Sequence, residues 1–272
     1  MRIGLSTYAY FWRLSEKLSN PMTLFEVLED SARLGASVFQ ICDYPQIIDW
    51  PLSELSRLSL QASKANITLE LGTKGVKSEH LQKYLTIAKT LNCTLLRTMI
   101  NTPSHQPTLS EAKQNIEKVL PFFEDAGVAI CLETYEQVPT DINIALVEMI
   151  NSPLVGICLD PANCIASLEN PMELVSKVSP YVLNWHVKDF VFSRSEGWVG
   201  FQLIGCPLGE GLLSYDHIYQ KIQPKKRNIN QIIEHWLPWQ GDAKNTCNIE
   251  SDWTEKNMRY LINKNNSHLN CL

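Results

Sequence analysis

Short apolar, β-branched segments alternate along this chain with longer amphipathic segments. The interiors of the apolar segments are nearly continuous, which is typical of parallel strands that are covered on both faces. Clean alternation of polar and apolar residues would instead indicate strands with one solvent face. We predict eight such strands, over residues 2–10, 37–44, 67–75, 93–101, 128–136, 155–163, 182–190 and 229–236.

The segments between these strands carry helical patterns. Residues 21–36 place apolar side chains at the spacing of one helix face. A second helix is predicted from Ser78, which we expect to be its N-cap. A third helix is predicted over 109–127, with a kink or break at Pro121, because proline cannot donate the helical hydrogen bond.

Strands and helical crossovers in regular alternation predict a single closed (β/α)₈ TIM barrel over residues 1–264. The polar tail 265–272 is predicted to be disordered. An open doubly wound sheet is the alternative, but its usual glycine-rich turn is absent after the first strand. The long segment 191–213 shows no helical pattern, and we expect a functional loop over the mouth of the barrel.

Composition narrows the class of protein. The 272 residues carry a net charge of −5, which excludes the basic footprint of a nucleic-acid-binding protein. No apolar run is long enough for a membrane span, and the N-terminus lacks a signal-peptide pattern, so we predict a cytoplasmic protein. The eight cysteines lie mostly in apolar segments without C-x-x-C spacing, which indicates free thiols.

Candidate chemistry lies where the last four predicted strands end. Glu133, Asp160, His186 and Glu234 each follow an apolar run, and barrel enzymes carry their active sites at these carboxyl ends. Three carboxylates and an imidazole suit one divalent ion such as Mn²⁺, Mg²⁺, Co²⁺ or Zn²⁺. Each residue alone is more often a solvated or structural one, so the prediction depends on all four converging.

Several motifs resemble those of the xylose-isomerase-like barrels, which include sugar isomerases and epimerases, inosose dehydratases and family-2 apurinic endonucleases. The motifs are "LE" at 132–133, "LDPAN" at 159–163, "HVKDF" at 186–190, "GxG" at 209–211 and Glu234. The phrases "LELGTKG", "GCPLGEG" and "EHWLPWQGD" are more similar to 3-oxo-isoapionate decarboxylases. Members of this superfamily are often dimers or tetramers, so a homo-oligomer is compatible with the resemblance.

The resemblance implies that Glu133 and Glu234 flank the substrate and move a proton while contacting the metal. Asp160 and His186 would then be ligands only. We therefore expect a metal-dependent enzyme that acts on a small sugar or keto-sugar acid through an enediolate or enolate, in the first place an isomerase or epimerase. The alternative is a decarboxylase of a 3-oxo sugar acid, or a keto-sugar lyase or dehydratase.

Three further residues are candidates for substrate binding. A decarboxylase needs a cation for the substrate carboxylate, which Arg97 or Lys188 could supply, although either could instead form an ordinary salt bridge. Asn163 is predicted to bind a hydroxyl group or a metal ligand, and otherwise is a turn residue.

Two other functions fit the sequence less well. A three-metal endonuclease needs more ligands than the six histidines and their neighbours offer, and the negative net charge opposes it. A non-catalytic carbohydrate-binding barrel would not need four ligands around an open metal position.

Overall fold

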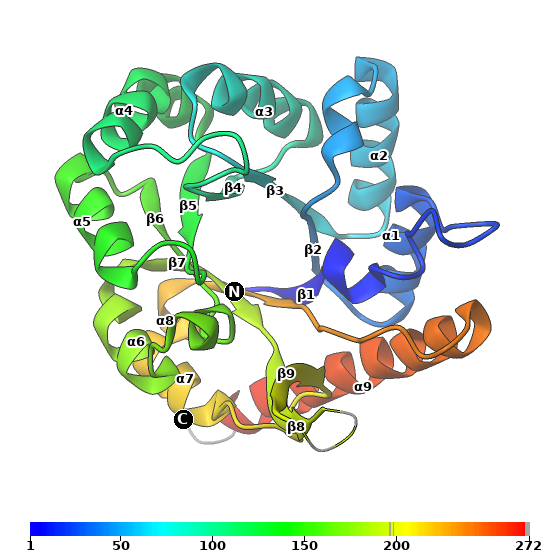
Figure 1. Ribbon diagram of the computed structural model, residues 1–272. Helices are drawn as coiled ribbons and strands as arrows, with labels where there is room; N and C mark the ends of the chain where they lie inside the picture. Colours follow the sequence, from blue (N-terminus) through cyan, green and yellow to red (C-terminus); the bar gives the residue numbers. More distant parts are fainter. Residues whose placement is uncertain (196, 198, 270–272) are drawn as a thin grey trace.

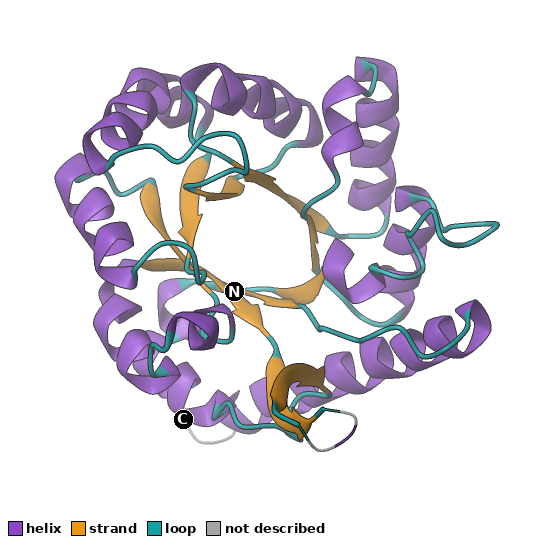
Figure 2. Ribbon diagram, in the orientation of Figure 1, coloured by secondary structure: helices purple, strands orange, loops and turns teal. Residues whose placement is uncertain are grey.

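The computed structural model describes residues 1–195, 197 and 199–269. Eight parallel strands close into a barrel, and helices surround it (Figures 1 and 2), which confirms the predicted single TIM barrel. Around the barrel the strands follow the order β1 (Ile3–Ser6), β10 (Asn230–Ile233), β7 (Val182–Val187), β6 (Val155–Leu159), β5 (Ala129–Glu133), β4 (Leu95–Met99), β3 (Thr68–Lys74) and β2 (Val38–Ile41).

Helices form the outer layer around the barrel (Figure 2). They are α1 (Leu24–Arg33), α2 (Leu52–Lys64), α3 (Ser78–Leu91), α4 (Leu109–Ala126), α5 (Thr140–Ile150), α6 (Pro171–Val178), α7 (Tyr215–Ile222), α8 (Pro224–Arg227) and α9 (Ala243–Leu269). Short 3₁₀ turns cover Thr7–Tyr10, Pro45–Asp49, Asn163–Ser167 and Ser179–Tyr181. α1 is closed by a capping box between Thr23 and Glu26, which satisfies two backbone donors at its start.

Two local helix predictions need correction. The break allowed for at Pro121 is absent, because α4 runs through Pro121 as one helix, while a kink there stays a prediction. Pro121 lies on the exposed side, where water can bond the carbonyl that the missing N–H leaves free. Ser78 is the first helical residue of α3 rather than its N-cap, and its hydroxyl donates a hydrogen bond to Asn115.

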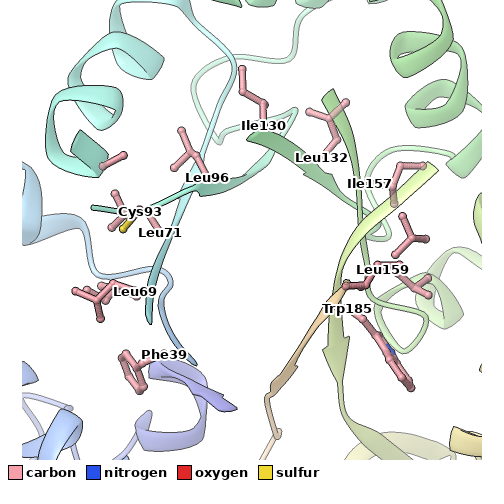
Figure 3. Packing of buried hydrophobic residues seen from close by; sticks show 14 of the residues in the cluster. Phe39, Leu69, Leu71, Cys93, Leu96, Ile130, Leu132, Ile157, Leu159 and Trp185 are labelled. Atoms are coloured by element: carbon pink, nitrogen blue, oxygen red, sulfur yellow. The ribbon is translucent and has the colours of Figure 1, made fainter. Parts of the chain in front are cut away.

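Alternation along each strand separates the core from the barrel interior. On β5, Ile130 and Leu132 belong to the large core between strands and helices, which Figure 3 shows. Cys131 and Glu133 lie on the opposite face of the same strand, because successive side chains point to opposite sides. The inward face therefore carries the chemistry, and the outward face holds the barrel together.

The segment after β7 differs from the predicted loop. The strands β8 (Asp189–Arg194) and β9 (Phe201–Cys206) pair in antiparallel fashion, and the predicted strand 182–190 is interrupted at Lys188. The described part of the segment holds two strands and no α-helix. Each strand pairs with the other, only a few residues away, and such local antiparallel pairing needs no long crossover.

The C-terminal helix corrects the predicted disordered tail 265–272. Residues 265–269 are the last turns of α9, and Asn265 is buried, accepts a hydrogen bond from Gln231 and donates one to Leu261. Polar composition therefore did not imply disorder, because the buried amide has partners. Residues 270–272 of that prediction lie outside the described residues.

The seven cysteines in the described ranges are free thiols, and six of them are buried. Cys271 lies outside those ranges. Across the described residues, the helices are all too short or too polar to cross a membrane. A cytoplasmic location and a homo-oligomer stay predictions.

Candidate metal centre

Four strands that are neighbours in the barrel bring the four predicted ligands together. Glu133, Asp160, His186 and Glu234 stand at or just beyond the ends of β5, β6, β7 and β10, and each is at most 2% exposed. The Nδ1 atom of His186 lies 3.5 Å from Glu133 Oε1, 3.7 Å from Asp160 Oδ2 and 3.5 Å from Glu234 Oε1. One imidazole nitrogen thus faces an oxygen from each of three carboxylates.

The orientation of His186 is set from the other side of its ring. Its Nε2 atom lies 2.8 Å from Gln40 Oε1, and the amide nitrogen of Gln40 donates to Glu70 at 2.9 Å. Since an amide oxygen only accepts, Nε2 must carry the hydrogen. In a neutral ring the Nδ1 lone pair therefore points at the three carboxylates.

This arrangement fits a divalent cation. Within the described ranges, Nδ1 of His186 is a buried polar atom without a hydrogen-bond partner. A lone pair that faces carboxylate oxygens is repelled unless a positive charge lies between them. Ligand atoms of Glu133, Asp160 and His186 lie within 4.8 Å of one another, and oxygen with imidazole nitrogen suits Mg²⁺, Mn²⁺, Co²⁺ or Zn²⁺.

Two buried cations contact the same carboxylates. Lys188 Nζ lies 2.6 Å from Asp160 Oδ2, 2.9 Å from Glu234 Oε2 and 4.6 Å from the ring centre of Trp236. Arg97 forms an ion pair with Glu133 and is 3% exposed. The predicted substrate cations are therefore at the site, and each is paired with a candidate ligand.

The charges of the site are strongly coupled. Burial opposes the charge of Lys188, but Asp160 and Glu234 outweigh it and raise the pKa of the amine well above its usual range. Burial also opposes the charge of Glu133, but Arg97 and His186 outweigh it and hold the pKa of that carboxyl well below its usual range. Glu133 and Lys188 are therefore charged at neutral pH.

The same acidic surroundings act on the imidazole. Burial lowers the pKa of His186, yet acidic neighbours, first Cys158 and then Glu234, raise it well above the usual value. The site thus draws positive charge to Nδ1 of His186.

Asn163 contacts one of the candidate ligands, while its predicted part in substrate or metal binding stays a prediction. Its Nδ2 donates to Glu133 Oε1 at 3.0 Å and to the Thr134 carbonyl at 3.3 Å. It stands at the start of the 3₁₀ turn after β6, in the "LDPAN" motif. The side chain therefore orients Glu133. Ser6 acts in the same way on Glu234, to which its hydroxyl donates at 3.1 Å.

Several residues of the site were not predicted from the sequence. Gln40 and Glu70 lie inside apolar strand segments, and Asp43 follows β2 with a φ of 45°. Asp43 accepts from the Tyr8 hydroxyl, and its carboxylate lies 3.0 Å from Lys74 and 3.5 Å from Arg97. A polar residue that interrupts an apolar strand run was the available signal.

Two hollows lie at the mouth of the barrel. One of about 340 Å³ is lined by aromatic residues that include Phe11, Trp12 and Trp236, and by β9. The other, of about 190 Å³, is lined by Cys42 and Asp43. Tyr8 and Phe11 line both, whereas the neighbouring Tyr10 is buried in the core. An apolar wall with a few polar groups is typical of small-molecule sites.

Known proteins resemble this chain along nearly its whole length. It is 50% identical over 265 residues to a 3-oxo-isoapionate decarboxylase from Pectobacterium atrosepticum, covering 97% of this chain and 96% of that protein. A crystal structure of a D-psicose 3-epimerase in the presence of D-fructose superposes with a TM-score of 0.72, at 15% identity, over 96% and 97% of the two chains.

A xylose isomerase-like TIM barrel protein from Mycobacterium smegmatis, solved in complex with magnesium, has a TM-score of 0.67 at 16% identity, over 94% of this chain and 96% of that one. At such identity the two solved structures establish the fold alone. The model of the xylose isomerase-like TIM barrel family matches residues 28–264. The chain therefore belongs to the xylose isomerase-like TIM barrel family.

Proposed function

We propose that this protein is a divalent-metal-dependent decarboxylase of a small 3-oxo sugar acid. The observation that carries the proposal is the 50% identity to a 3-oxo-isoapionate decarboxylase over 97% of the chain. The site supports it, because two buried cations accompany the candidate metal ligands. We therefore place decarboxylation before isomerisation, which reverses the order that the motifs alone favoured.

Four residues would hold the metal: Glu133, Asp160, His186 and Glu234. A bound divalent ion would supply the positive charge that stabilises the enolate oxygen formed when CO₂ leaves a β-keto acid. Asn163 and Ser6 fix the two glutamates through hydrogen bonds, so that little reorganisation is needed.

The chain's own groups would bind and orient the substrate. Lys188 is the cation nearest to both Asp160 and Glu234, and we assign it to the substrate carboxylate. Arg97 holds Glu133 and adds positive charge behind it. The aromatic wall formed by Phe11, Trp12 and Trp236 suits the carbon face of a small sugar chain and excludes water.

The test uses purified protein loaded with Mn²⁺ and incubated with a panel of 3-oxo sugar acids and ketoses. A product lighter by the mass of CO₂, with CO₂ release, supports decarboxylation. His186→Gln and Asp160→Asn should abolish turnover, whereas His105→Gln should not, because His105 is a partly buried residue that pairs with Glu111 rather than with a candidate ligand. Full activity after metal removal by EDTA would contradict the proposal.

Isomerisation or epimerisation is the second candidate, and one observation favours it. Glu133 and Glu234 both lie 3.5 Å from His186 Nδ1, so two carboxylates adjoin the same point, as proton transfer on two faces of a substrate requires. This activity would incorporate deuterium from D₂O into a ketose without loss of CO₂. Glu133→Gln and Glu234→Gln would then each stop that exchange.

A further inference from the structure

Below the candidate ligands, a buried carboxylate sits in a cluster of amides that the proposed function leaves unexplained. Glu70 on β3 is 1% exposed and is surrounded by amide donors from three other strands. Gln40 Nε2 and Asn184 Nδ2 donate to its Oε2 at 2.9 and 3.0 Å, and Asn230 Nδ2 donates to its Oε1 at 2.7 Å. Glu70 therefore fixes which end of each amide faces it.

Of these amides, Gln40 is the one whose orientation bears on the candidate metal centre. Its Nε2 also donates to Asn184 Oδ1 at 3.2 Å, so the nitrogen end faces two acceptors. A flipped amide would put its oxygen against both of those oxygens, which is unfavourable in a buried site. The oxygen end of Gln40 is thereby held towards His186 Nε2 at 2.8 Å and the Cys42 thiol at 2.6 Å, and both groups can donate to it.

We propose that Glu70, acting through Gln40, is a positioning residue that fixes the tautomer of His186, with the hydrogen on Nε2 and the lone pair on Nδ1. The inference rests on the proposed function only in that it gives Nδ1 a metal to bind. Neither Glu70 nor Gln40 contacts the candidate ligand atoms of the three carboxylates, so both act through the imidazole. Outer groups that orient a metal-bound histidine typically change metal affinity about 10–100-fold when they are replaced.

The test is the variant Glu70→Gln. The glutamine amide has one acceptor oxygen in place of two, so its nitrogen meets a donor that Glu70 had accepted. Gln40 and Asn184 both point at the Oε2 position, and a nitrogen there turns Gln40 so that its own nitrogen faces His186. We expect the affinity for MnCl₂, measured by titration calorimetry on metal-free protein, to fall about 10–100-fold. We also expect the His186 Nε2–H signal in ¹⁵N-resolved spectra to lose its protection from exchange.

The swap Gln40→Glu with Glu70→Gln is the rescue. A carboxylate at position 40 accepts from His186, and an amide at position 70 can donate to it, so the same tautomer returns. We expect the double variant to regain most of the lost Mn²⁺ affinity and the protected Nε2–H signal. A purely structural role for Glu70 predicts no such recovery.

Gln231 provides a matched control. It is an equally buried glutamine on β10, and its amide bonds Tyr215 and Asn265 rather than the site. Gln231→Met should lower stability without changing Mn²⁺ affinity. If Glu70→Gln does not fold, Gln40→Met is the substitute. It removes the Gln40 oxygen that accepts from His186 Nε2, at similar side-chain volume, and it should lower Mn²⁺ affinity to the same extent.

The outcomes separate this inference from the proposed function. If wild-type protein binds neither Mn²⁺ nor Zn²⁺, the proposed metal dependence falls, while loss and recovery of the protected Nε2–H signal still support the positioning role. If wild type binds Mn²⁺ and Glu70→Gln binds it equally well with an unchanged Nε2–H signal, the positioning role is overturned and the proposed function stands.

Discussion

At the scale of single residues, Lys188 places a positive charge among the candidate metal ligands. Its ammonium group lies 2.6 Å from Asp160 and 2.9 Å from Glu234, two carboxylates that we propose as metal ligands. A lysine is a compact charge that can move between partners on a flexible stem. Lys188 and a metal ion therefore repel each other and compete for the same oxygens, while both attract an anionic substrate.

This competition gives Lys188→Met two effects of opposite sign. Affinity for Mn²⁺ should rise, up to about tenfold, because a nearby positive charge is lost. Decarboxylation should fall at least about 100-fold in kcat/KM, because the substrate carboxylate loses its buried partner. Calorimetry and steady-state kinetics measure the two effects.

Lys74→Met is the control for Lys188, since Lys74 is 45% exposed and pairs with Asp43 at the edge of the site. It should leave Mn²⁺ affinity unchanged. Equal losses of metal binding and activity in Lys188→Met would instead mean that the lysine only holds the site together.

At the scale of elements, Asp189 joins the β8–β9 hairpin to the chain that leads into α7. Its carboxylate accepts backbone hydrogen bonds from Phe190, Gly209, Gly211 and Leu213 at 2.9–3.1 Å. A Cβ atom at Gly211 would lie 2.2 Å from Asp189 Oδ1, which explains the second glycine of the "GxG" motif. Because Asp189 directly follows Lys188, the same contacts hold Lys188 in place.

Asp189→Asn should therefore destabilise the protein by about 2–4 kcal/mol, because the amide nitrogen replaces one acceptor oxygen and faces two of the four backbone donors. Urea unfolding would measure the loss. Asp242→Asn serves as the comparison: Asp242 is exposed, accepts from Asn245 at 2.8 Å just before α9, and asparagine caps a helix about equally well. Similar losses of unfolding free energy in both variants would show that the buried Asp189 carboxylate stabilises the protein no more than the exposed Asp242 carboxylate does.

At the scale of the whole molecule, the barrel was predictable because each strand carries a continuous apolar run that buries on both faces. The four candidate ligands were predictable for the same reason, since each polar residue ends such a run. The hairpin was missed because β8 continues directly from the residues of β7, separated by Lys188 alone. α9 was missed because its pattern is largely polar. Its buried face combines the apolar Met258 and Leu261 with polar residues such as Glu250, which pairs with Arg13.

The Glu70 cluster marks the limit of sequence reasoning. Gln40, Glu70, Asn184 and Asn230 lie far apart in the chain, and each alone is a polar interruption of a strand. They meet because the barrel places β2, β3, β7 and β10 around one interior. Hydrogen bonds between side chains across a barrel depend on register, which the sequence pattern does not specify.

A bound metal should stabilise the barrel as a whole, because its proposed ligands come from β5, β6, β7 and β10, half of the closed sheet. A ligand that binds only the folded state adds about 2.7 kcal/mol at a free concentration of 100 times its Kd. For a chain of this size that corresponds to a rise in Tm of about 5–10 °C. Mn²⁺ is the suitable probe, because cysteine thiolates of the unfolded chain would bind Zn²⁺ and reduce the effect. Thermal unfolding with Mn²⁺ and with EDTA should show this difference in wild type and in His105→Gln, and little or none in His186→Gln. A shift that persists in His186→Gln would place the metal elsewhere in the protein.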